Sequence, residues 1–103
     1  MLKTHALIQV ALAIMDDPTE KYWGYQLSKA SGVRSGALYP ILTRMLYEGW
    51  LTDGWEDPAT IKGKRPTRRY YELTDAGRLA LDGLLAEARR DPRFIAHVGQ
   101  GHN

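Results

Sequence analysis

The sequence predicts a mainly α-helical domain that carries one two-stranded β-hairpin. Four segments show helical spacing of apolar residues or helix-end signals, and they come in the order helix, helix, helix, hairpin, helix. Two β-compatible runs stand between the third and fourth helical segments, separated by a loop that contains Pro58, Gly63 and Pro66. A chain of 103 residues rarely divides its core, so these elements are expected to form one domain.

Composition narrows the class of protein without naming it. The chain has 44% hydrophobic and 25% charged residues, a net charge of +2 and no cysteine, which excludes disulfide scaffolds and thiolate metal sites. The apolar segment 2–15 lacks a basic leader and is too short to span a bilayer, so we expect a cytoplasmic protein with no membrane partner. We assign residues 1–91 to the folded domain, with its last helix at about 75–91, and residues 92–103 to a C-terminal tail, whose order the sequence leaves open.

The first predicted helix, residues 2–15, is apolar on most of its circumference and should be buried on more than one side. One stripe at helical spacing is expected to face the core and consists of Leu7, Val10, Ala11 and Ile14. A second stripe is expected to face another subunit and consists of Ile8, Leu12 and Met15. Asp16, Asp17 and Pro18 should end the helix, because the residue before a proline avoids the α region.

The second and third helices should form a helix-turn-helix. A short helix at 24–30 is followed by the turn Ser31-Gly32 and then by the clearest apolar stripe of the chain, Leu38, Ile41, Leu42, Met45 and Leu46. Ser35 is the expected N-cap of the third helix and Gly49 its C′ residue. Pro40 lies inside this helix, so we expect an irregular first turn.

The hairpin is expected to pair residues 50–55 with residues 69–73, with residues 56–68 as its loop. Tyr70 and Tyr71 are adjacent in the second strand, so one should face the core and the other the solvent. Five of the eight residues from Lys62 to Arg69 are basic, namely Lys62, Lys64, Arg65, Arg68 and Arg69. Taken alone, such a run is as well explained by a solvated loop as by a binding surface.

Thr74 should cap a last helix that carries apolar residues on two sides. Because a helix outside three small helices has little surface to pack on, we expect it to form a homodimer with the second stripe of the first helix. The interface residues assigned to this helix are Leu81, Leu84, Leu85 and Ala88.

Three helices followed by a hairpin is the order of a winged helix-turn-helix, in which the hairpin tip is the wing. With its apolar stripe committed to the core, the third helix and its surroundings offer a polar face for duplex DNA, comprising Tyr25, Arg34, Ser35, Gly36, Tyr39, Thr43 and Arg44. The wing would contact phosphates through Lys62, Lys64, Arg65 and Arg68. On this hypothesis a dimer binds a pseudo-palindromic operator with half-sites about one helical turn apart.

Three stretches of the chain also resemble a known family. "GYQL" at 24–27, "SGALYPILTRMLYEGWL" at 35–51 and "RRYYELTDAGR" at 68–78 are similar, in order and spacing, to the PadR-like transcriptional regulators. The resemblance implies a dimeric winged-helix repressor of the smaller branch, with one C-terminal helix that dimerises with the first. It also implies that a small-molecule effector releases the operator, although the sequence assigns no identity to that effector.

Other classes of function find less support in the sequence. A winged helix that binds a protein instead of specific DNA is the main alternative. His5, His97 and His102 lack the spacing of a metal site, and no serine, threonine or carboxylate pair stands in a catalytic pattern. We therefore expect no catalytic residue, no metal site and no cofactor.

Overall fold

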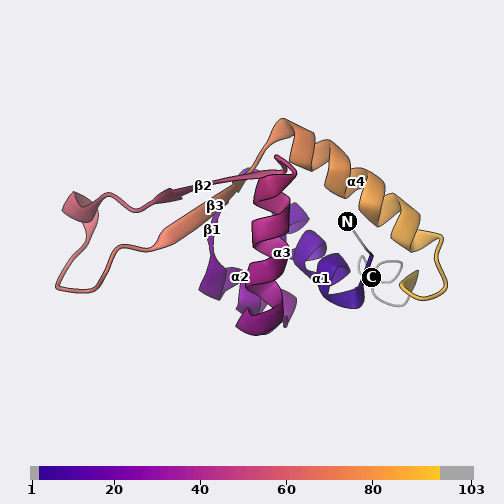
Figure 1. The fold of residues 1–103 in the computed structure, drawn as a ribbon, viewed down its shortest axis with the longest axis horizontal. Helices are drawn as coiled ribbons and strands as arrows, with labels where there is room; N and C mark the ends of the chain where they lie inside the picture. The colour runs from indigo at the N-terminus through magenta and orange to yellow at the C-terminus, as the bar shows by residue number, and fades with distance from the viewer. Residues whose placement is uncertain (1–2, 96–103) are drawn as a thin grey trace.

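The computed structural model describes residues 3–95 of the chain, which form four helices and a small antiparallel sheet (Figure 1). The helices and strands are α1 His5–Asp16, β1 Lys21–Trp23, α2 Gly24–Ser31, α3 Ser35–Tyr47, β2 Leu51–Trp55, β3 Arg69–Leu73 and α4 Asp75–Arg89, with a short 3-10 turn at Pro58–Thr60. The hairpin of β2 and β3 projects to one side of the helices, and α4 runs away on the other side (Figure 1). The mainly α-helical fold with a β-hairpin that the sequence predicts is confirmed.

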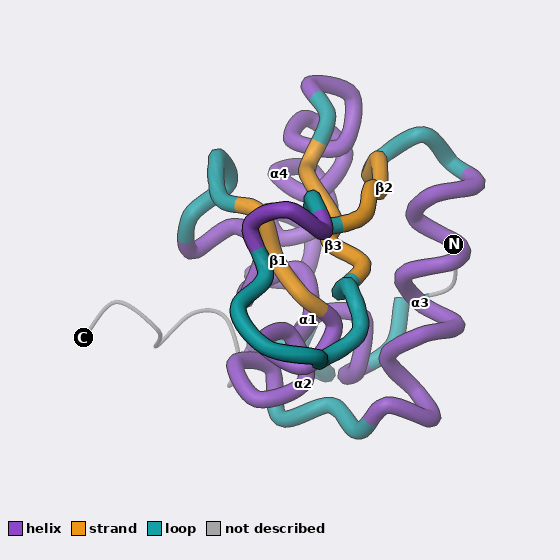
Figure 2. The backbone as a smooth tube through the Cα atoms, turned by 90° about the vertical axis from the view of Figure 1, so that its left-hand side faces the viewer, coloured by secondary structure: helices purple, strands orange, loops and turns teal. Residues whose placement is uncertain are grey.

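The sheet has a third strand that the sequence analysis missed. Its strand order is β1-β3-β2, with both pairs antiparallel, so that β3 lies in the centre (Figure 2). In the central strand Tyr71 is 2% exposed while Tyr70 is half-buried, which is the alternation that a strand imposes on neighbours. β1 places Tyr22 opposite Tyr71 and ties the start of α2 to the hairpin.

The ends of α3 were predicted with mixed success. Gly49 has φ +77°, and the N–H groups of Gly49 and Trp50 donate to the carbonyls of Leu46 and Met45 at 3.1 and 2.9 Å. This is a Schellman motif, and it confirms the C′ role of Gly49. The predicted N-cap at Ser35 is wrong by one residue, because the extended residue before the helix is Arg34.

The first turn of α3 contains one 3-10 type hydrogen bond, and the α-helix continues through Pro40. The carbonyl of Arg34 accepts hydrogen bonds from the N–H groups of both Ala37 and Leu38, at 3.0 and 2.8 Å. The former is a 3-10 type bond, which tightens the turn.

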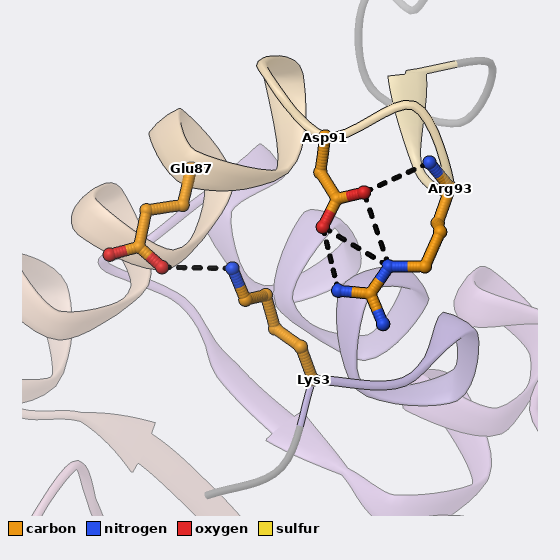
Figure 3. Close-up of polar contacts among 4 residues, drawn as sticks. All are labelled: Lys3, Glu87, Asp91 and Arg93. Atoms are coloured by element: carbon orange, nitrogen blue, oxygen red, sulfur yellow. Dashed lines mark hydrogen bonds and ion pairs between the residues drawn. The ribbon is translucent and has the colours of Figure 1, made fainter.

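α4 packs along α1 of its own chain, and this corrects part of the predicted dimer interface. Four of the seven residues assigned to that interface are at most 4% exposed within the single chain, namely Ile8, Leu81, Leu85 and Ala88. The other three, Leu12, Met15 and Leu84, remain partly exposed. Lys3 adds a 2.9 Å ion pair to Glu87 of α4 (Figure 3). The apolar side chains of α4 are therefore buried mainly against α1 of the same chain, and only part of the predicted interface is left for a second chain.

The chain continues to pack after α4. Residues 92–95, which the sequence assigned to the tail, follow a turn in which the Asp91 carboxylate accepts hydrogen bonds from Arg93 (Figure 3). Phe94 is 2% exposed and meets the ring of His5 edge-on, with 4.9 Å between ring centres. The remainder of the predicted tail, including His97 and His102, lies outside the described residues. No helix within residues 3–95 is long and apolar enough to cross a membrane.

Candidate nucleic-acid interface

The hairpin loop, residues 56–68, forms an extended tip beyond the ends of β2 and β3 (Figure 1). Its base is closed by two hydrogen bonds: the Glu56 N–H donates to the Arg68 carbonyl at 2.9 Å, and the Arg68 N–H donates to the Glu56 carboxylate at 3.1 Å. Gly63 turns the loop with φ +83°, in the left-handed region that glycine enters without strain. The predicted basic segment thus lies on a protruding arm with a fixed base.

Carboxylates at the base of the wing engage two of its arginines. Arg65 donates to both carboxylate oxygens of Glu56, at 2.7 and 2.8 Å. This hydrogen bonding, followed by the N–H of Arg68, holds the pKa of Glu56 at about 2, against an ordinary value of 4.5. Arg69 donates to Asp53 at 2.7 Å. The sequence shows these acids before the basic run, but not that they pair with it.

The other wing cations are open to solvent. Lys62 and Lys64 are exposed and make no ion pair among residues 3–95. Arg68 is also exposed, with its guanidinium carbon 5.7 Å from the ring centre of Trp23. Placed over an aromatic face, the Arg68 charge is oriented without being neutralised. These three side chains form the accessible positive charge of the wing.

The outer face of α3 carries the predicted polar residues. Ser35, Gly36, Thr43 and Arg44 are all exposed, and Arg44 makes a 3.5 Å ion pair with Glu48 one turn later. The same face continues to Tyr47, which is 84% exposed and which the sequence analysis missed. Its position four residues after Thr43 was the available signal.

The Tyr39 side chain packs against Gly24, the first residue of α2. A Cβ added to Gly24 would lie 2.2 Å from the Tyr39 hydroxyl and less than 3.0 Å from two ring carbons. The ring therefore rests on the bare backbone of Gly24, where any other residue would push it away. Tyr39 is nevertheless 45% exposed, so part of its side chain is accessible to a ligand while the contact with Gly24 restricts its position.

A recess of about 290 Å³ joins α2, α3 and the base of the wing. It is lined by three residues that the sequence assigned to DNA binding, Tyr25, Tyr39 and Arg68, and by Trp23, Gly24, Arg69 and Tyr71. Burial is the main cause that raises the pKa of Tyr71, so its phenol stays neutral at physiological pH. The structure thus brings together predicted residues that are 43 positions apart in the sequence, from Tyr25 to Arg68.

The N-cap side chains of the two helices that border this recess accept no helix N–H group. Thr4 and Thr74 cap α1 and α4 through their hydroxyls, but Trp23 and Arg34, the N-cap residues of α2 and α3, make no side-chain cap bond. At the start of α2 the Gln26 side chain accepts the N–H of Trp23 at 2.9 Å. The indole of Trp23 has no acceptor atom to offer. Their first N–H groups therefore add to the positive potential of this side of the molecule.

Taken together, this side presents exposed cations, hydroxyls and the N-terminal ends of two helices, which suits a polyanion. Among the described residues no group of histidine, cysteine and carboxylate side chains could hold a metal ion. A projecting wing beside an exposed third helix defines the winged-helix DNA-binding fold.

Comparison with known proteins identifies the family. Residues 12–83 match the model of the transcriptional regulator PadR-like family, so the chain belongs to this family of transcriptional regulators. None of the curated proteins compared with the chain matches it.

Several solved structures share the fold of this chain. The chain is similar to smu.1704 of Streptococcus mutans UA159, with a TM-score of 0.69 and 24% identity over 100% of this chain and 97% of that one. The chain is also similar to BpsR of Bordetella bronchiseptica, with a TM-score of 0.67 and 20% identity over 98% of this chain and 68% of that one. The DNA binding of BpsR is regulated by 6-hydroxynicotinic acid. Bacillus subtilis PadR, solved in complex with operator DNA, has a TM-score of 0.58 and 22% identity over 77% of this chain and 47% of that one.

Proposed function

We propose that this chain is a DNA-binding repressor that places α3 in the major groove and its wing on the adjacent backbone. The observation that carries the proposal is the convergence of Tyr25, Tyr39 and Arg68 on one recess, with the free cations of the wing beside it. Phosphate contacts by such cations fix the position of a protein on a duplex, and polar groups of the helix in the groove read the bases. Occupation of an operator that overlaps a promoter would then block transcription.

Within this proposal each predicted residue has a role that follows from its place. Arg34, at the start of α3, and Arg44, one turn before its end, reach the backbone on either side of the groove. Ser35, Gly36 and Thr43 are small, which allows the helix to approach the base edges closely. Lys62 and Lys64, at the tip of the wing, contact phosphates outside the groove, whereas Arg65 must first leave Glu56.

We also propose a homodimer built on the surfaces of α1 and α4 that the single chain leaves open. Leu12, Met15 and Leu84 remain partly exposed, and Leu79 of α4 is 75% exposed. Apolar side chains on neighbouring helices are a suitable contact for a two-fold related copy. Such a dimer would present two α3 helices to a pseudo-palindromic operator.

A small-molecule effector is the third part of the proposal. It is supported by the regulation of DNA binding in the Bordetella neighbour by 6-hydroxynicotinic acid, and no effector is assigned to this chain.

A gel-shift experiment tests the proposed function. The chain is titrated against a duplex from the region upstream of its own gene, with excess unrelated duplex as competitor. The expected result is a retarded complex that Tyr39→Ala weakens, while Arg89→Ala, at an exposed cation on the far end of α4, leaves it unchanged. If every duplex is bound equally weakly and a protein partner is captured with the same face, the alternative of a protein-interaction module replaces the proposal.

A further inference from the structure

The end of α3 and the start of α4 meet at a single junction (Figure 1). The Thr74 hydroxyl donates to the carbonyl of Gly49 at 2.7 Å, and the Thr74 N–H donates to the carbonyl of Trp50 at 3.0 Å. The same hydroxyl oxygen accepts the Gly77 N–H at 2.9 Å, as the N-cap of α4. One side chain therefore links the segment that follows α3, at Gly49, to the first turn of α4.

Gly77 brings the two elements closer than any other residue would allow. A Cβ on Gly77 would lie 2.0 Å from the carbonyl oxygen of Trp50 and less than 3.0 Å from two further backbone atoms. The obstructing atoms are backbone, so a side-chain rotation cannot relieve the clash. Because Gly49 and Trp50 are themselves fixed by the Schellman motif of α3, the first turn of α4 is seated directly on the end of α3.

We infer that Thr74 and Gly77 are positioning residues, which set the angle between the DNA-reading helix and the dimerisation helix and thereby the distance between the two α3 helices of the dimer. The inference rests on the proposed function, since it requires that α4 contributes to the dimer and α3 to DNA reading. Neither residue needs to touch DNA or the partner chain. Their effect is on half-site spacing, because a rigid junction transmits the geometry of the dimer to the reading helices.

The expected displacement follows from the close contact. Real Cβ atoms are essentially never found closer than 3.0 Å to such atoms, so Gly77→Ala must move α4 away from Trp50 by about 1 Å. Two-fold symmetry applies the movement in both protomers, which gives a change of up to about 2 Å between the α3 helices.

A spin-label distance measurement tests this directly. The chain has no cysteine, so Ala37→Cys, on the exposed start of α3, introduces one label site in each protomer. The inter-label distance distribution is measured by double electron-electron resonance in this background and again with Gly77→Ala. Gly83→Ala is the matched control, because it makes the same substitution in the same helix with nothing within 4 Å of the new Cβ.

The expected result is a narrow distribution that Gly77→Ala shifts by up to about 2 Å and Gly83→Ala does not move. Thr74→Val is a second test that does not introduce a clash. It should broaden the distribution by removing the hydroxyl link, while Thr74→Ser retains the link and the original distribution. Melting curves of all variants separate loss of stability, which lowers the folded fraction, from a change of angle, which moves the distance.

A DNA selection gives the functional readout. A pool of random duplexes is enriched with the wild-type chain and, separately, with the Gly77→Ala variant. Both should recover the same half-site sequence, but the variant should enrich the neighbouring spacing, one base pair away, more strongly than the wild-type chain does, because a change of about 2 Å is more than half of the rise of about 3.4 Å per base pair. Identical distances and identical spacings in the two chains would overturn the inference. Absence of any inter-protomer distance or of any enriched sequence with the wild-type chain would instead overturn the proposed function, and the inference with it.

Discussion

The ion pair between Arg65 and Glu56 makes the wing cations unequal in a way that can be measured. Arg65 is held by two hydrogen bonds to Glu56, whereas Arg68 is exposed and lies over the ring of Trp23. A cation that neutralises a phosphate releases a counterion, but a cation that must leave a carboxylate to do so exposes a new negative charge. We therefore predict that Arg68→Ala changes the salt dependence of DNA binding and that Arg65→Ala changes it far less.

The magnitude follows from counterion release. Each neutralised phosphate contributes about −0.9 to the slope of log affinity against log salt concentration. Arg68→Ala should reduce the slope by about 0.9, so that a fourfold rise in salt costs this variant about 3.5-fold less affinity than it costs the wild-type chain. Arg65→Ala should change the slope by less than about half that amount. Glu56→Gln should free Arg65 and steepen the slope by up to about 0.9.

Fluorescence anisotropy with a labelled duplex of arbitrary sequence is sufficient, because the electrostatic part of binding is independent of sequence. The titrations are repeated between about 50 and 200 mM salt, with Arg89→Ala on α4 as a control that should not change the slope. Adding Arg65→Ala to the Glu56→Gln background should return the slope to the wild-type value. Equal slope changes for Arg65→Ala and Arg68→Ala in the wild-type background would refute the reasoning, since the pair would then not persist in the complex.

Three further predictions follow from packing and charge. Gly24→Ala should displace the Tyr39 ring into solvent, with a loss of DNA affinity of about tenfold but a stability change below about 1 kcal/mol, as measured by anisotropy and thermal melting. Because the pKa of Glu56 is lowered to about 2, its contribution to stability is fully present above pH 4.5 and is lost as pH falls from 4.5 towards 2; melting curves across that range should show the loss, and Glu56→Gln should reduce it. Phe94→Ala should cost about 3 kcal/mol in urea unfolding, because Phe94 is 2% exposed, whereas Ile95→Ala, at a residue 50% exposed, should stay within about 0.5 kcal/mol.

Local signals in the sequence were sufficient for most of the secondary structure. The bounds of β3, the Thr74 cap and the left-handed Gly49 were predicted, because each depends on a few adjacent residues. β1 was missed since three residues are too few to show strand alternation. Arg34 takes the N-cap position of α3 although its side chain makes no cap bond. The general preference for serine as an N-cap therefore placed the predicted start of α3 one residue too late.

Contacts between distant segments were harder to predict. Ile8 and Leu81 were assigned to the dimer because apolar residues on two sides of a helix do not reveal which side the chain itself covers. The structure shows that α4 returns along α1 and buries both. Phe94 escaped notice for the same reason, since its contact with His5 joins opposite ends of the described chain.

For the candidate site too, local patterns could be predicted from the sequence and contacts between distant segments could not. The basic run of the wing and the polar face of α3 are visible in the sequence, and the structure adds that Tyr25, Tyr39 and Arg68 line one recess. Trp23 and Tyr47 were not predicted, because their places in the candidate site depend on the position of α2 and on the exposure of the last turn of α3. Nor could the sequence show which arginine of the wing is paired with an acid.

Hydroxyl-radical footprinting on a duplex enriched by the chain from a random pool tests the central claim most directly. The account predicts two protected backbone segments related by a dyad and about one helical turn apart. It also predicts flanking protection that disappears when Lys64 and Arg68 are both replaced by alanine. A footprint that keeps its flanks in this wing variant, or a pool from which the chain enriches no sequence, would contradict the account.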